Sequence, residues 1–494
     1  MRRIEEATFA GGVTAEKLME EVGRRIADAV MQAVRGKGVA AVYYGKGHNG
    51  GDALEAARNL AMYGWVIELR PLDPDPSKLE EAKGRMKASA MSGILRSGRI
   101  RTQRTPRPDV IIDGLLGIGA AGPLRQDVRE LTREINARRA NGSALVFAVD
   151  LPTGLNADTG EADPDCVVAD LTVTAGFAKS GMVADGAAAF VGRLCVAPLR
   201  EFEPAAPLGC VGETATPESL RGVLPRRNFD SYKTQYGRIG IVAGSLGFTG
   251  AAILCASGAL RAGAGLVTVY APEDIQPIVA AKAPPEVMVH PVKSYEEVLV
   301  EKHDVLAVGP GLGKGRAGAI LQLVEYAEGP MVLDADGLNI VAGHDTGLLA
   351  RCAGARLLTP HPGEMARLFP EAKELSRHET ATRFTARFAQ ARCPITLLLK
   401  GSRTIIHEDG KPASYNTTGN PGMGTGGMGD VLTGVCAALI GQHLSPYDAA
   451  RVGAWVCGRA AEIAVAERSE ESLAAMDVVE SLGTAFTLLR GGGL

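Results

Sequence analysis

The amino-acid sequence predicts an α/β protein built from two domains, each organised around a mostly parallel sheet. Short apolar runs alternate with amphipathic stretches along the chain, which is the pattern of strands alternating with helices. Many apolar runs end in loops rich in glycine and proline, and the 62 glycines suit such strand-to-helix turns. A length of 494 residues accommodates two or three domains of roughly 100–200 residues each.

The first half begins with an amphipathic helix over 14–35, for which Thr14 is the predicted N-cap and Gly36 the stop. A strand at 39–44, a glycine loop and a helix over 53–63 follow, as at the start of a βαβ unit. The other predicted elements complete a doubly wound sheet between helices: strands at 65–69, 109–113, 144–149, 171–174 and 194–197, and helices at 77–91 and 126–138.

Three polar loops follow directly after strands of this first half. They carry Asn49 and Asp52, then Asp113, then Asp150 and Thr153. Because ligands bind at the carboxyl ends of the strands in open α/β sheets, we expect these loops to contribute to one site. The first loop also precedes a helix, whose N-terminus favours a phosphate-bearing ligand.

A second domain starts after residues 199–217, which lose hydrophobic periodicity and gain prolines. We place the boundary near 208, which gives domains of 1–208 and 209–494. A helix of small residues ending near 262 is expected to be central, because another backbone can pack closely on it. The other predicted elements are strands at 238–243, 266–270, 287–290, 304–308, 331–333, 357–359, 395–399 and 405–407, and helices at 430–441, 446–467 and 477–490.

Composition and charge exclude several classes of protein. The 53 Lys and Arg nearly balance the 56 Asp and Glu, and aromatic residues make up 5%, so no nucleic-acid surface is expected. No run of about 18 apolar residues predicts a membrane span, and the N-terminus leads into no apolar signal segment. The eight cysteines form no Cys-x-x-Cys pair, so we expect free thiols and a cytoplasmic protein. We also expect a homo-oligomer.

The most informative stretch is the glycine-rich segment 420–430, which leads into an apolar helix. Glycines let the backbone approach a ligand closely, and the following helix presents free N–H groups, so the segment predicts a phosphate site. Asp430 at its end is a poor phosphate ligand but a suitable general base for a hydroxyl. The stretch therefore predicts phosphoryl transfer from a nucleotide to a small alcohol. The alternative is a flexible loop followed by an ordinary helix-start Asp.

Motifs in both halves resemble those of known families. The second half resembles NAD(P)H-hydrate dehydratase, which has a ribokinase-like fold, at 230–233, 308–313, 333–339, 361–364 and 420–430. The first half is similar to NAD(P)H-hydrate epimerase at 45–52 and 148–154, which implies a Rossmann-like α/β/α sandwich. Joined in this order, the halves resemble the bifunctional NAD(P)H-hydrate repair enzymes over nearly the whole chain.

The resemblance implies repair of NADH or NADPH that has been hydrated at C6 of the nicotinamide ring. The epimerase half would interconvert the R and S epimers. The dehydratase half would remove water from the S form at the expense of ADP or ATP, by phosphorylating the C6 hydroxyl and eliminating phosphate. Asp430 would deprotonate that hydroxyl, and Mg²⁺ would neutralise the nucleotide phosphates.

The resemblance also assigns residues of the dehydratase half to two ligands. Nucleotide contacts map to Lys400, Gly401, Ser402, Arg403, Thr404, Asn420, Pro421, Gly422, Met423, Gly424, Thr425, Gly426, Gly427, Met428 and Gly429. Contacts to the hydrate map to Gly311, His361, Pro362, Gly363, Glu364, Met365, Ala366, Arg367 and Asp430.

In the epimerase half, the resemblance places K⁺ on Asn49, Asp113 and Thr153. Asp150 is the acid/base candidate, because inverting C6 needs reversible proton movement near the ring. Substrate contacts map to His48, Asn49, Gly50, Gly51, Asp52, Gly117, Ile118, Gly119, Ala120, Ala121, Gly122, Pro123 and Asp150.

Structural roles compete with these assignments at several positions. His361 could cap a loop, and Asp334 and Asp336 could start a helix rather than contact a metal or ribose. Asp113 could satisfy loop N–H groups, and Asp52 could cap a helix.

The loop at 117–123 departs from the epimerase pattern, since it lacks a Thr and an Arg usual there; Arg125 could replace that Arg. This departure leaves open a first half that binds ligand without catalysis. A kinase for a small alcohol is the other alternative. The presence of Asn49, Asp150 and Thr153 argues against such a kinase, which would not need the first half.

Overall fold

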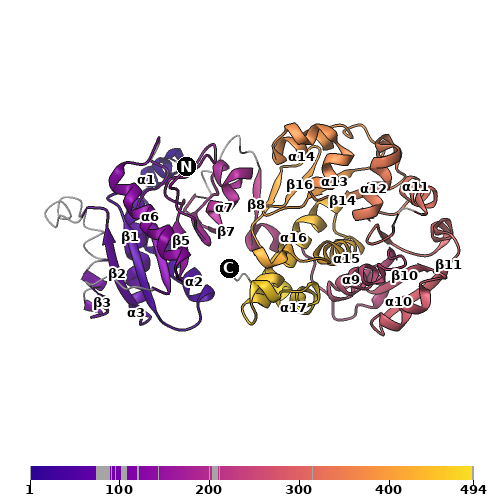
Figure 1. The fold of residues 1–494 in the computed structure, drawn as a ribbon, viewed down its shortest axis with the longest axis horizontal. Coiled ribbons are helices and arrows are strands. Elements are labelled where there is room, and N and C mark those ends of the chain that lie inside the picture. The colour runs from indigo at the N-terminus through magenta and orange to yellow at the C-terminus, as the bar shows by residue number, and fades with distance from the viewer. Residues whose placement is uncertain are drawn as a thin grey trace. The chain divides into compact units, whose positions relative to one another are not determined.

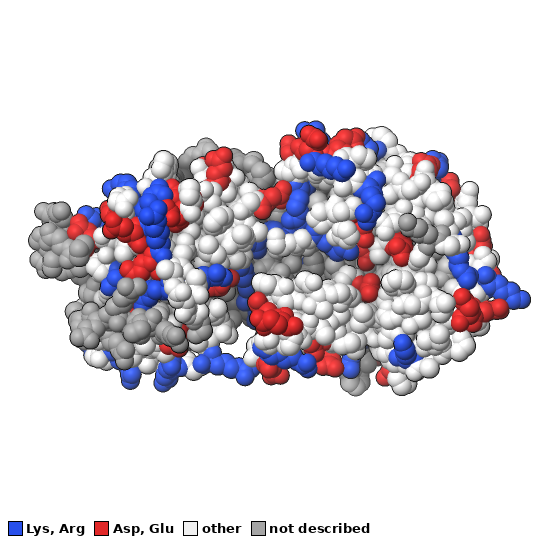
Figure 2. Space-filling model, in the orientation of Figure 1, with Lys and Arg blue, Asp and Glu red and all other residues white. Residues whose placement is uncertain are grey.

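The computed structural model describes residues 2–73, 90, 92–94, 96–101, 108–119, 122–142, 144–199, 201–202, 210, 212–313 and 315–491. The chain divides into two compact units, Met1–Cys210 and Val211–Leu494 (Figure 1). All eight cysteines are free, as predicted, and six of them are buried. No helix in the described part of the chain is long and apolar enough to cross a membrane. Acidic and basic side chains are interspersed over the face shown in Figure 2.

Unit 1 contains a seven-stranded, fully parallel sheet in the order β3-β2-β1-β4-β5-β6-β7. The predicted doubly wound sheet is therefore confirmed, and the order reverses between β1 and β4, where ligands bind in such folds. The strands are β1 (Val39–Tyr44), β2 (Val66–Pro71), β3 (Ile100–Arg101), β4 (Val110–Gly114), β5 (Leu145–Val149), β6 (Leu171–Ala175) and β7 (Arg193–Ala197).

The helices of unit 1 include one whose start was predicted wrongly. The helix expected over 53–63 is α3, and it begins at His48, because the glycines that suggested a turn form its first turn. A Cβ on Gly50 would lie 2.1 Å from the Gly45 carbonyl oxygen, so only glycine lets this turn pack on the loop before it. The helices are α1 (Arg2–Ala10), α2 (Ala15–Ala33), α3 (His48–Met62), α6 (Gln126–Ala140) and α7 (Ala188–Val191), with 3₁₀ turns at Ser180–Val183 and Asp185–Ala187.

Two other predictions for unit 1 have different outcomes. Thr14 caps α2 as expected, since its hydroxyl accepts from the Lys17 N–H at 3.3 Å. The helix α1 was not predicted. Of the helix expected at 77–91, the described residues include Ala90 alone.

A buried ion pair holds α6 to the sheet of unit 1. Arg138 donates to Glu68 at 3.1 and 3.3 Å and to the Tyr43 hydroxyl at 2.7 Å. The two charged side chains are only 4% and 2% exposed. We therefore expect Arg138→Ala, which removes both hydrogen bonds to the buried Glu68 carboxylate and leaves Arg70 at 4.0 Å from it, to lower the free energy of unfolding by about 3 kcal/mol.

Urea denaturation of the full chain measures this effect, with Arg139→Ala as the matched control. Arg139 lies next along α6 and pairs with Asp170, but its side chain is 39% exposed. Its loss should reduce stability by no more than about 1 kcal/mol. Equal losses of stability in Arg138→Ala and Arg139→Ala would contradict the expectation that the buried ion pair contributes more than the exposed one.

Unit 2 contains a ten-stranded sheet in the order β11-β10-β9-β12-β13-β14-β15-β16-β17-β8. Its pairs are parallel except at β16, which runs antiparallel to both neighbours, so the hairpin predicted at 405–407 is confirmed. The strands are β8 (Glu213–Ala215), β9 (Arg238–Val242), β10 (Leu266–Pro272), β11 (Val287–Val292), β12 (Val305–Val308), β13 (Met331–Leu333), β14 (Arg356–Leu358), β15 (Ile395–Leu399), β16 (Ile405–Glu408) and β17 (Ser414–Asn416).

The small-residue helix predicted to be central in unit 2 is α9. The small-residue helix α9 packs tightly on α15: a Cβ on Gly434 would lie 1.9 Å from the Cys255 carbonyl oxygen. Every residue of α15 from Val431 to Gly441 is buried, so the core fixes the helix that follows the glycine-rich segment. The helices are α8 (Pro217–Arg221), α9 (Thr249–Arg261), α10 (Gln276–Lys282), α11 (Ala317–Tyr326), α12 (Ala335–His344), α13 (Pro362–Leu368), α14 (Arg377–Ala386), α15 (Met428–Gly441), α16 (Pro446–Val465) and α17 (Ala475–Gly491).

Candidate active sites

In unit 2, the N-terminus of α15 forms an open cradle beside an acidic side chain. Gly427, with φ of +91°, turns the chain into the helix, a backbone conformation that favours glycine. Gly424 and Gly426 are exposed, and a Cβ on either would meet no atom within 4 Å. The N–H groups at the start of the helix are therefore available to an anion, with Asp430 in the same first turn.

Asp430 has the properties of a general base. The pKa of its carboxyl is raised to about 7, mainly by burial and in addition by the nearby Asp334 charge, while the Lys400 ammonium opposes both. A carboxylate with a pKa near neutrality is a much stronger base than an exposed one. The cradle thus combines an anion site with a base.

Asp334, which follows β13, anchors the charges around this base. Its carboxylate is 1% exposed and accepts hydrogen bonds from the Lys400 ammonium at 2.8 Å and the Thr433 hydroxyl at 2.9 Å. It occupies the N-cap position of α12, as the helix-start alternative predicted, but its side chain makes no capping hydrogen bond. Burial alone would lower the pKa of Lys400, but the charge and hydrogen bond of Asp334, together with the Glu364 and Asp430 charges, raise that pKa. Sequence reasoning missed this role of Asp334 and the contribution of Thr433.

His361 caps α13, as its structural alternative predicted. Its Nδ1 accepts from the N–H groups of Gly363 at 3.0 Å and Glu364 at 3.3 Å, while the Glu364 carboxylate accepts from the His361 N–H at 2.9 Å. Since Nδ1 is an acceptor, a neutral ring carries its proton on Nε2. The cap places the predicted contacts Pro362, Gly363, Glu364, Met365, Ala366 and Arg367 on one short helix, where Glu364 and Met365 are buried.

A chain of polar contacts joins α13 to the loop that carries Gly311. Arg367 Nε donates to the Asn339 side-chain oxygen at 2.8 Å, and the Asn339 amide contacts Asp336 at 3.5 Å. Asp336 in turn accepts from the Gly313 N–H at 2.8 Å. The predicted hydrate contacts on α13 and in the 309–313 loop are therefore connected through α12.

The candidate nucleotide residues after β15 differ in accessibility. Gly401 and Ser402 are exposed, whereas the Arg403 side chain is buried, and burial together with the nearby Arg377 charge lowers its pKa to about 10. Arg377, which was not predicted, donates to the carbonyl oxygens of Leu399 and Lys400 at 3.0 and 3.2 Å. The Thr404 hydroxyl donates to the Gly401 carbonyl at 3.1 Å, so side chains fix this loop from within.

The other candidate nucleotide residues precede α15. Asn420 starts the short 3₁₀ turn Pro421–Gly424, and its side-chain oxygen accepts from the Gly422 N–H at 3.0 Å. Its Nδ2 is buried without a hydrogen-bond partner. Met423 and Met428 are partly buried, while Gly424, Thr425 and Gly426 face solvent.

In unit 1, the three predicted potassium ligands form one connected cluster. The Thr153 hydroxyl donates to Asp113 at 2.7 Å and accepts from the Leu116 N–H at 3.1 Å, and the Asn49 amide donates to the Leu116 carbonyl at 2.6 Å. Asp113 also accepts from the N–H groups of Thr153 and Leu115 at 2.8 and 3.3 Å, as its loop-satisfying alternative predicted.

Two properties of this cluster suit a hard cation. The Asn49 side-chain oxygen is buried and has no hydrogen-bond partner, which leaves a carbonyl oxygen available as a ligand. Burial raises the pKa of Asp113 to about 6, against hydrogen bonds from Thr153 and Leu115. Asn49, Asp113 and Thr153 thus fit a K⁺ site, because all three offer hard oxygen ligands.

Asp150 forms a buried ion pair that sequence reasoning missed. Lys179 is 5% exposed; its ammonium contacts the Asp150 carboxylate and donates to the Thr174 hydroxyl at 2.7 Å. Asp150 has φ of +62°, an uncommon conformation for a residue with a side chain, and strain of this kind clusters at functional sites. The only sequence signal for the pair was a lone Lys in an otherwise uncharged stretch after β6.

The remaining predicted contacts of unit 1 lie at α3 and in the loop after β4. His48 is exposed, Gly50 and Gly51 are buried, and Asp52 lies inside α3, so the prediction that Asp52 caps the helix is wrong. Gly117 and Ile118 are half-buried, while Gly119, Gly122 and Pro123 are exposed. Ala120 and Ala121 lie outside the described residues. Arg125 precedes α6, is 74% exposed and lies 3.8 Å from Asp127.

Comparison with known proteins matches two family models to two separate parts of the chain. The family model described as NAD(P)H-hydrate dehydratase matches residues 239–483, and the model described as YjeF-related protein N-terminus matches residues 15–181. A bifunctional NAD(P)H-hydrate repair enzyme of Moorella thermoacetica is 36% identical, covering 94% of this chain and 91% of the relative. The corresponding Escherichia coli enzyme is 34% identical over 97% of this chain and 90% of its own.

A solved structure supports the fold of the second half. A ribokinase-like superfamily protein from Enterococcus faecalis is 26% identical with a TM-score of 0.50, covering 57% of this chain and 98% of that protein. The second half is thus ribokinase-like, and the first is Rossmann-like in its strand order. Both halves and nearly the full length match, so the chain belongs to the family of bifunctional NAD(P)H-hydrate repair enzymes.

Proposed function

We propose that the chain repairs NAD(P)H hydrates at two sites, with epimerisation in unit 1 and nucleotide-dependent dehydration in unit 2. The observation that carries this proposal is the position of Asp430, a base with a pKa of about 7 in the first turn of a helix behind an open glycine cradle. That arrangement suits transfer of a phosphoryl group to a hydroxyl, the step that makes the C6 hydroxyl a leaving group.

The dehydration proceeds in two steps. Asp430 accepts the C6 hydroxyl proton as that oxygen bonds to the terminal phosphorus of ADP or ATP, and the bond from phosphorus to the leaving nucleotide breaks. The N–H groups of Gly426–Gly429 hold the transferring phosphoryl and stabilise its charge. The C6–O bond then breaks with its electrons on the departing phosphate as the lone pair of the ring nitrogen forms a C6=N iminium. Loss of a proton from C5 to the departing phosphate forms the C5=C6 double bond and restores the dihydronicotinamide ring.

Mg²⁺ enters this site with the nucleotide rather than on a protein cage. Among the residues that the structure describes, no group of three or more His, Cys, Asp or Glu side chains could hold a metal. The Asp334 carboxylate bonds to Lys400 and Thr433, and Glu364 lies 3.9 Å from the same ammonium. Mg²⁺ commonly takes phosphate oxygens and water with few protein ligands, and there it neutralises phosphate charge.

The epimerisation uses Asp150 with Lys179. Asp150 accepts the C6 hydroxyl proton, and the bond from C6 to the ring nitrogen breaks with its electron pair on nitrogen. Closing that bond on the opposite face and returning the proton to oxygen gives the other epimer. Asn49, Asp113 and Thr153 would hold K⁺, which would supply positive charge near the bound dinucleotide, and we expect the residues of 48–52 and 117–123 to contact the substrate.

The test follows recovery of NADH absorbance from a mixture of both hydrate epimers with ADP or ATP, Mg²⁺ and K⁺. Complete recovery, faster than spontaneous epimerisation allows, supports both activities in one chain. Recovery that stops when the S form is consumed means that unit 1 is a binding module without catalysis. If no NADH is recovered and a stable phosphorylated alcohol forms instead, the chain is a small-alcohol kinase.

The dehydratase should lose activity as the pH falls through 7. Asp430 must be ionised to accept a proton, and its pKa is about 7. The kcat/KM for the S epimer should therefore fall about tenfold per pH unit below that value. A profile measured in constant ionic strength checks this, and a flat profile down to about pH 5 would exclude Asp430 as the base.

Potassium activation of the epimerase should depend on Asn49. Asn49→Leu removes the unpartnered side-chain oxygen, and we expect the apparent K⁺ affinity to fall about 10- to 100-fold. The matched control is Asn59→Leu, because Asn59 lies on the same helix and donates to the Glu55 carbonyl at 2.8 Å. Equal K⁺ titrations for Asn49→Leu and the unaltered chain would place the cation elsewhere.

A cytoplasmic homo-oligomer is also part of the proposal. The eight free thiols fit a reducing compartment. Light scattering on the purified chain measures its assembly, and a monomer at micromolar concentration would contradict that part.

A further inference from the structure

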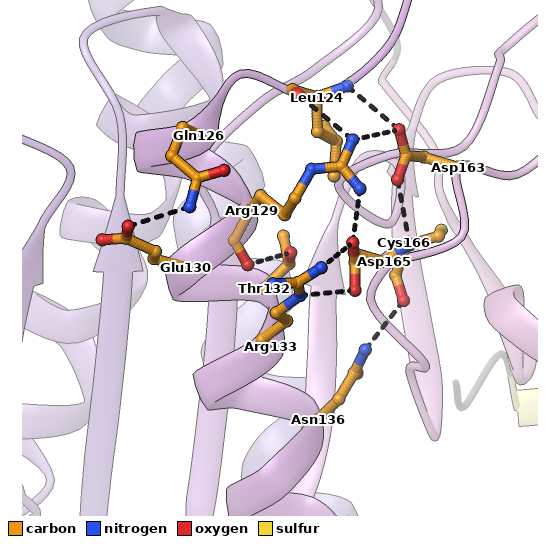
Figure 3. A network of polar contacts seen from close by, with 10 residues as sticks. All are labelled: Leu124, Gln126, Arg129, Glu130, Thr132, Arg133, Asn136, Asp163, Asp165 and Cys166. Atoms are coloured by element: carbon orange, nitrogen blue, oxygen red, sulfur yellow. Dashed lines mark hydrogen bonds and ion pairs between the residues drawn. The ribbon is translucent and has the colours of Figure 1, made fainter.

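A polar network ties down the residue at which the candidate substrate loop of unit 1 ends. Leu124 follows that loop, and its N–H donates to Asp163 at 3.0 Å (Figure 3). Arg129, on the first turns of α6, donates to the Leu124 carbonyl at 3.3 Å and to Asp163 at 3.2 Å. One guanidinium and one carboxylate therefore hold both backbone groups of Leu124.

Asp163, which supplies this carboxylate, lies in the segment that follows Asp150 and Thr153. The Asp163 N–H donates to the Gly154 carbonyl at 2.8 Å, and the Val167 N–H donates to the Thr153 carbonyl at 2.9 Å. Asp163 is therefore fixed to the loop of Asp150 and Thr153. Through Leu124, the network joins the two loops that carry substrate and cation candidates.

The members of the network differ in what they touch. Asp163 is 7% exposed; burial alone would raise its pKa, but the N–H groups of Asp165 and Leu124 and the Arg129 charge hold that pKa low. Arg129 contacts Asp163, Asp165 and Leu124. Arg133, one turn further along α6 and 59% exposed, bonds to Asp165 at 2.8 and 3.0 Å. Arg129 thus contacts Leu124, directly after the substrate loop, whereas Arg133 contacts Asp165, which also pairs with Arg129 (Figure 3).

We propose that Arg129 and Asp163 are positioning residues of the epimerase, which fix the C-terminal end of the candidate substrate loop, at Pro123 and Leu124, relative to Asp150 and Thr153. The Arg125 side chain is 74% exposed and forms its ion pair with Asp127, at 3.8 Å. Arg129 instead holds the Leu124 carbonyl, directly after that loop. The inference rests on the proposed epimerase function of unit 1.

The test compares Arg129→Ala with Arg133→Ala in the full chain. For the R epimer, we expect Arg129→Ala to raise the epimerase KM about 10- to 100-fold with kcat little changed, because a misplaced loop weakens binding. Arg133→Ala should change KM less than about threefold. Turnover of the S epimer by unit 2 is the internal control and should stay the same in both variants.

Several outcomes would overturn the inference. Equal effects of the two substitutions would mean that the network only stabilises the fold, and an unchanged KM in Arg129→Ala would exclude a positioning role. If Arg129→Ala unfolds unit 1 by circular dichroism, Asp163→Asn, which keeps the shape, must show the same rise in KM. Failure of the unaltered chain to turn over the R epimer would instead sink the epimerase proposal itself.

Discussion

Replacing Asp430 by Asn will lower the dehydratase kcat about 10²- to 10⁴-fold, with little change in the KM for the S epimer or the nucleotide. Asn keeps the size of the side chain and its place in the first turn of α15 but cannot accept the hydroxyl proton. The glycine cradle and its N–H groups remain, so binding persists. Recovery of NADH from the pure S epimer measures the loss, and R-to-S conversion by unit 1 of the same chain shows that the variant is intact.

The stability of this variant provides an independent check. The pKa of Asp430 is raised from 3.8 to about 7, so the folded chain holds this proton more tightly than the unfolded chain does. Its contribution to stability is therefore present below pH 3.8 and is lost as the pH rises through 7. The amide of Asp430→Asn does not titrate, so the melting temperature of the variant should gain on that of the unaltered chain between pH 5 and about pH 8. A kcat within tenfold of normal, or no such gain, would contradict a buried catalytic base.

Most of the fold could be predicted because its signals are local. Apolar runs bounded by glycine predicted most strands of both sheets, and period-3.6 patterns predicted long helices such as α2 and α16. The start of α3 was predicted wrongly because glycine favours both turns and tight packing. The strands β3, β8 and β17 were not predicted, and β8 and β17 pair only across about 200 residues of chain.

The candidate sites show the same division between local and distant information. Asp430 and the glycine cradle were predictable because a motif of consecutive residues makes them. The hydrogen bonds of Asp334 with Lys400 and Thr433 were not predictable. These two residues lie 66 and 99 residues from Asp334 in sequence and meet it only in the folded domain. The topology brings the ends of β13 and β15 to one edge, and so places Asp334, which raises the pKa of Asp430 in addition to its burial, beside Lys400, which lowers it.

Replacing Lys179 by Met will lower epimerase kcat about 10²-fold or more, as will replacing Asp150 by Asn. The Lys179 ammonium contacts the Asp150 carboxylate and orients it, together with the Thr174 hydroxyl, toward one rotamer. Because the pair acts as a unit, the double variant should be no slower than the worse single one. Conversion of the R epimer, with excess added dehydratase to report the S form, measures each rate.

Stability separates this catalytic role from a purely structural one. Lys179→Met removes the ammonium beside Asp150, which is 16% exposed and keeps hydrogen bonds from the Thr174 hydroxyl and the Ala175 N–H, so the free energy of unfolding should fall by about 1–3 kcal/mol. In the double variant no charge is left in the pair, so most of that stability should return, since apolar or neutral replacement of a buried ion pair is often tolerated. Activity should not return with it. A double variant that regains both would show that the pair serves only the fold, because a catalytic carboxylate cannot be replaced by restoring packing around it.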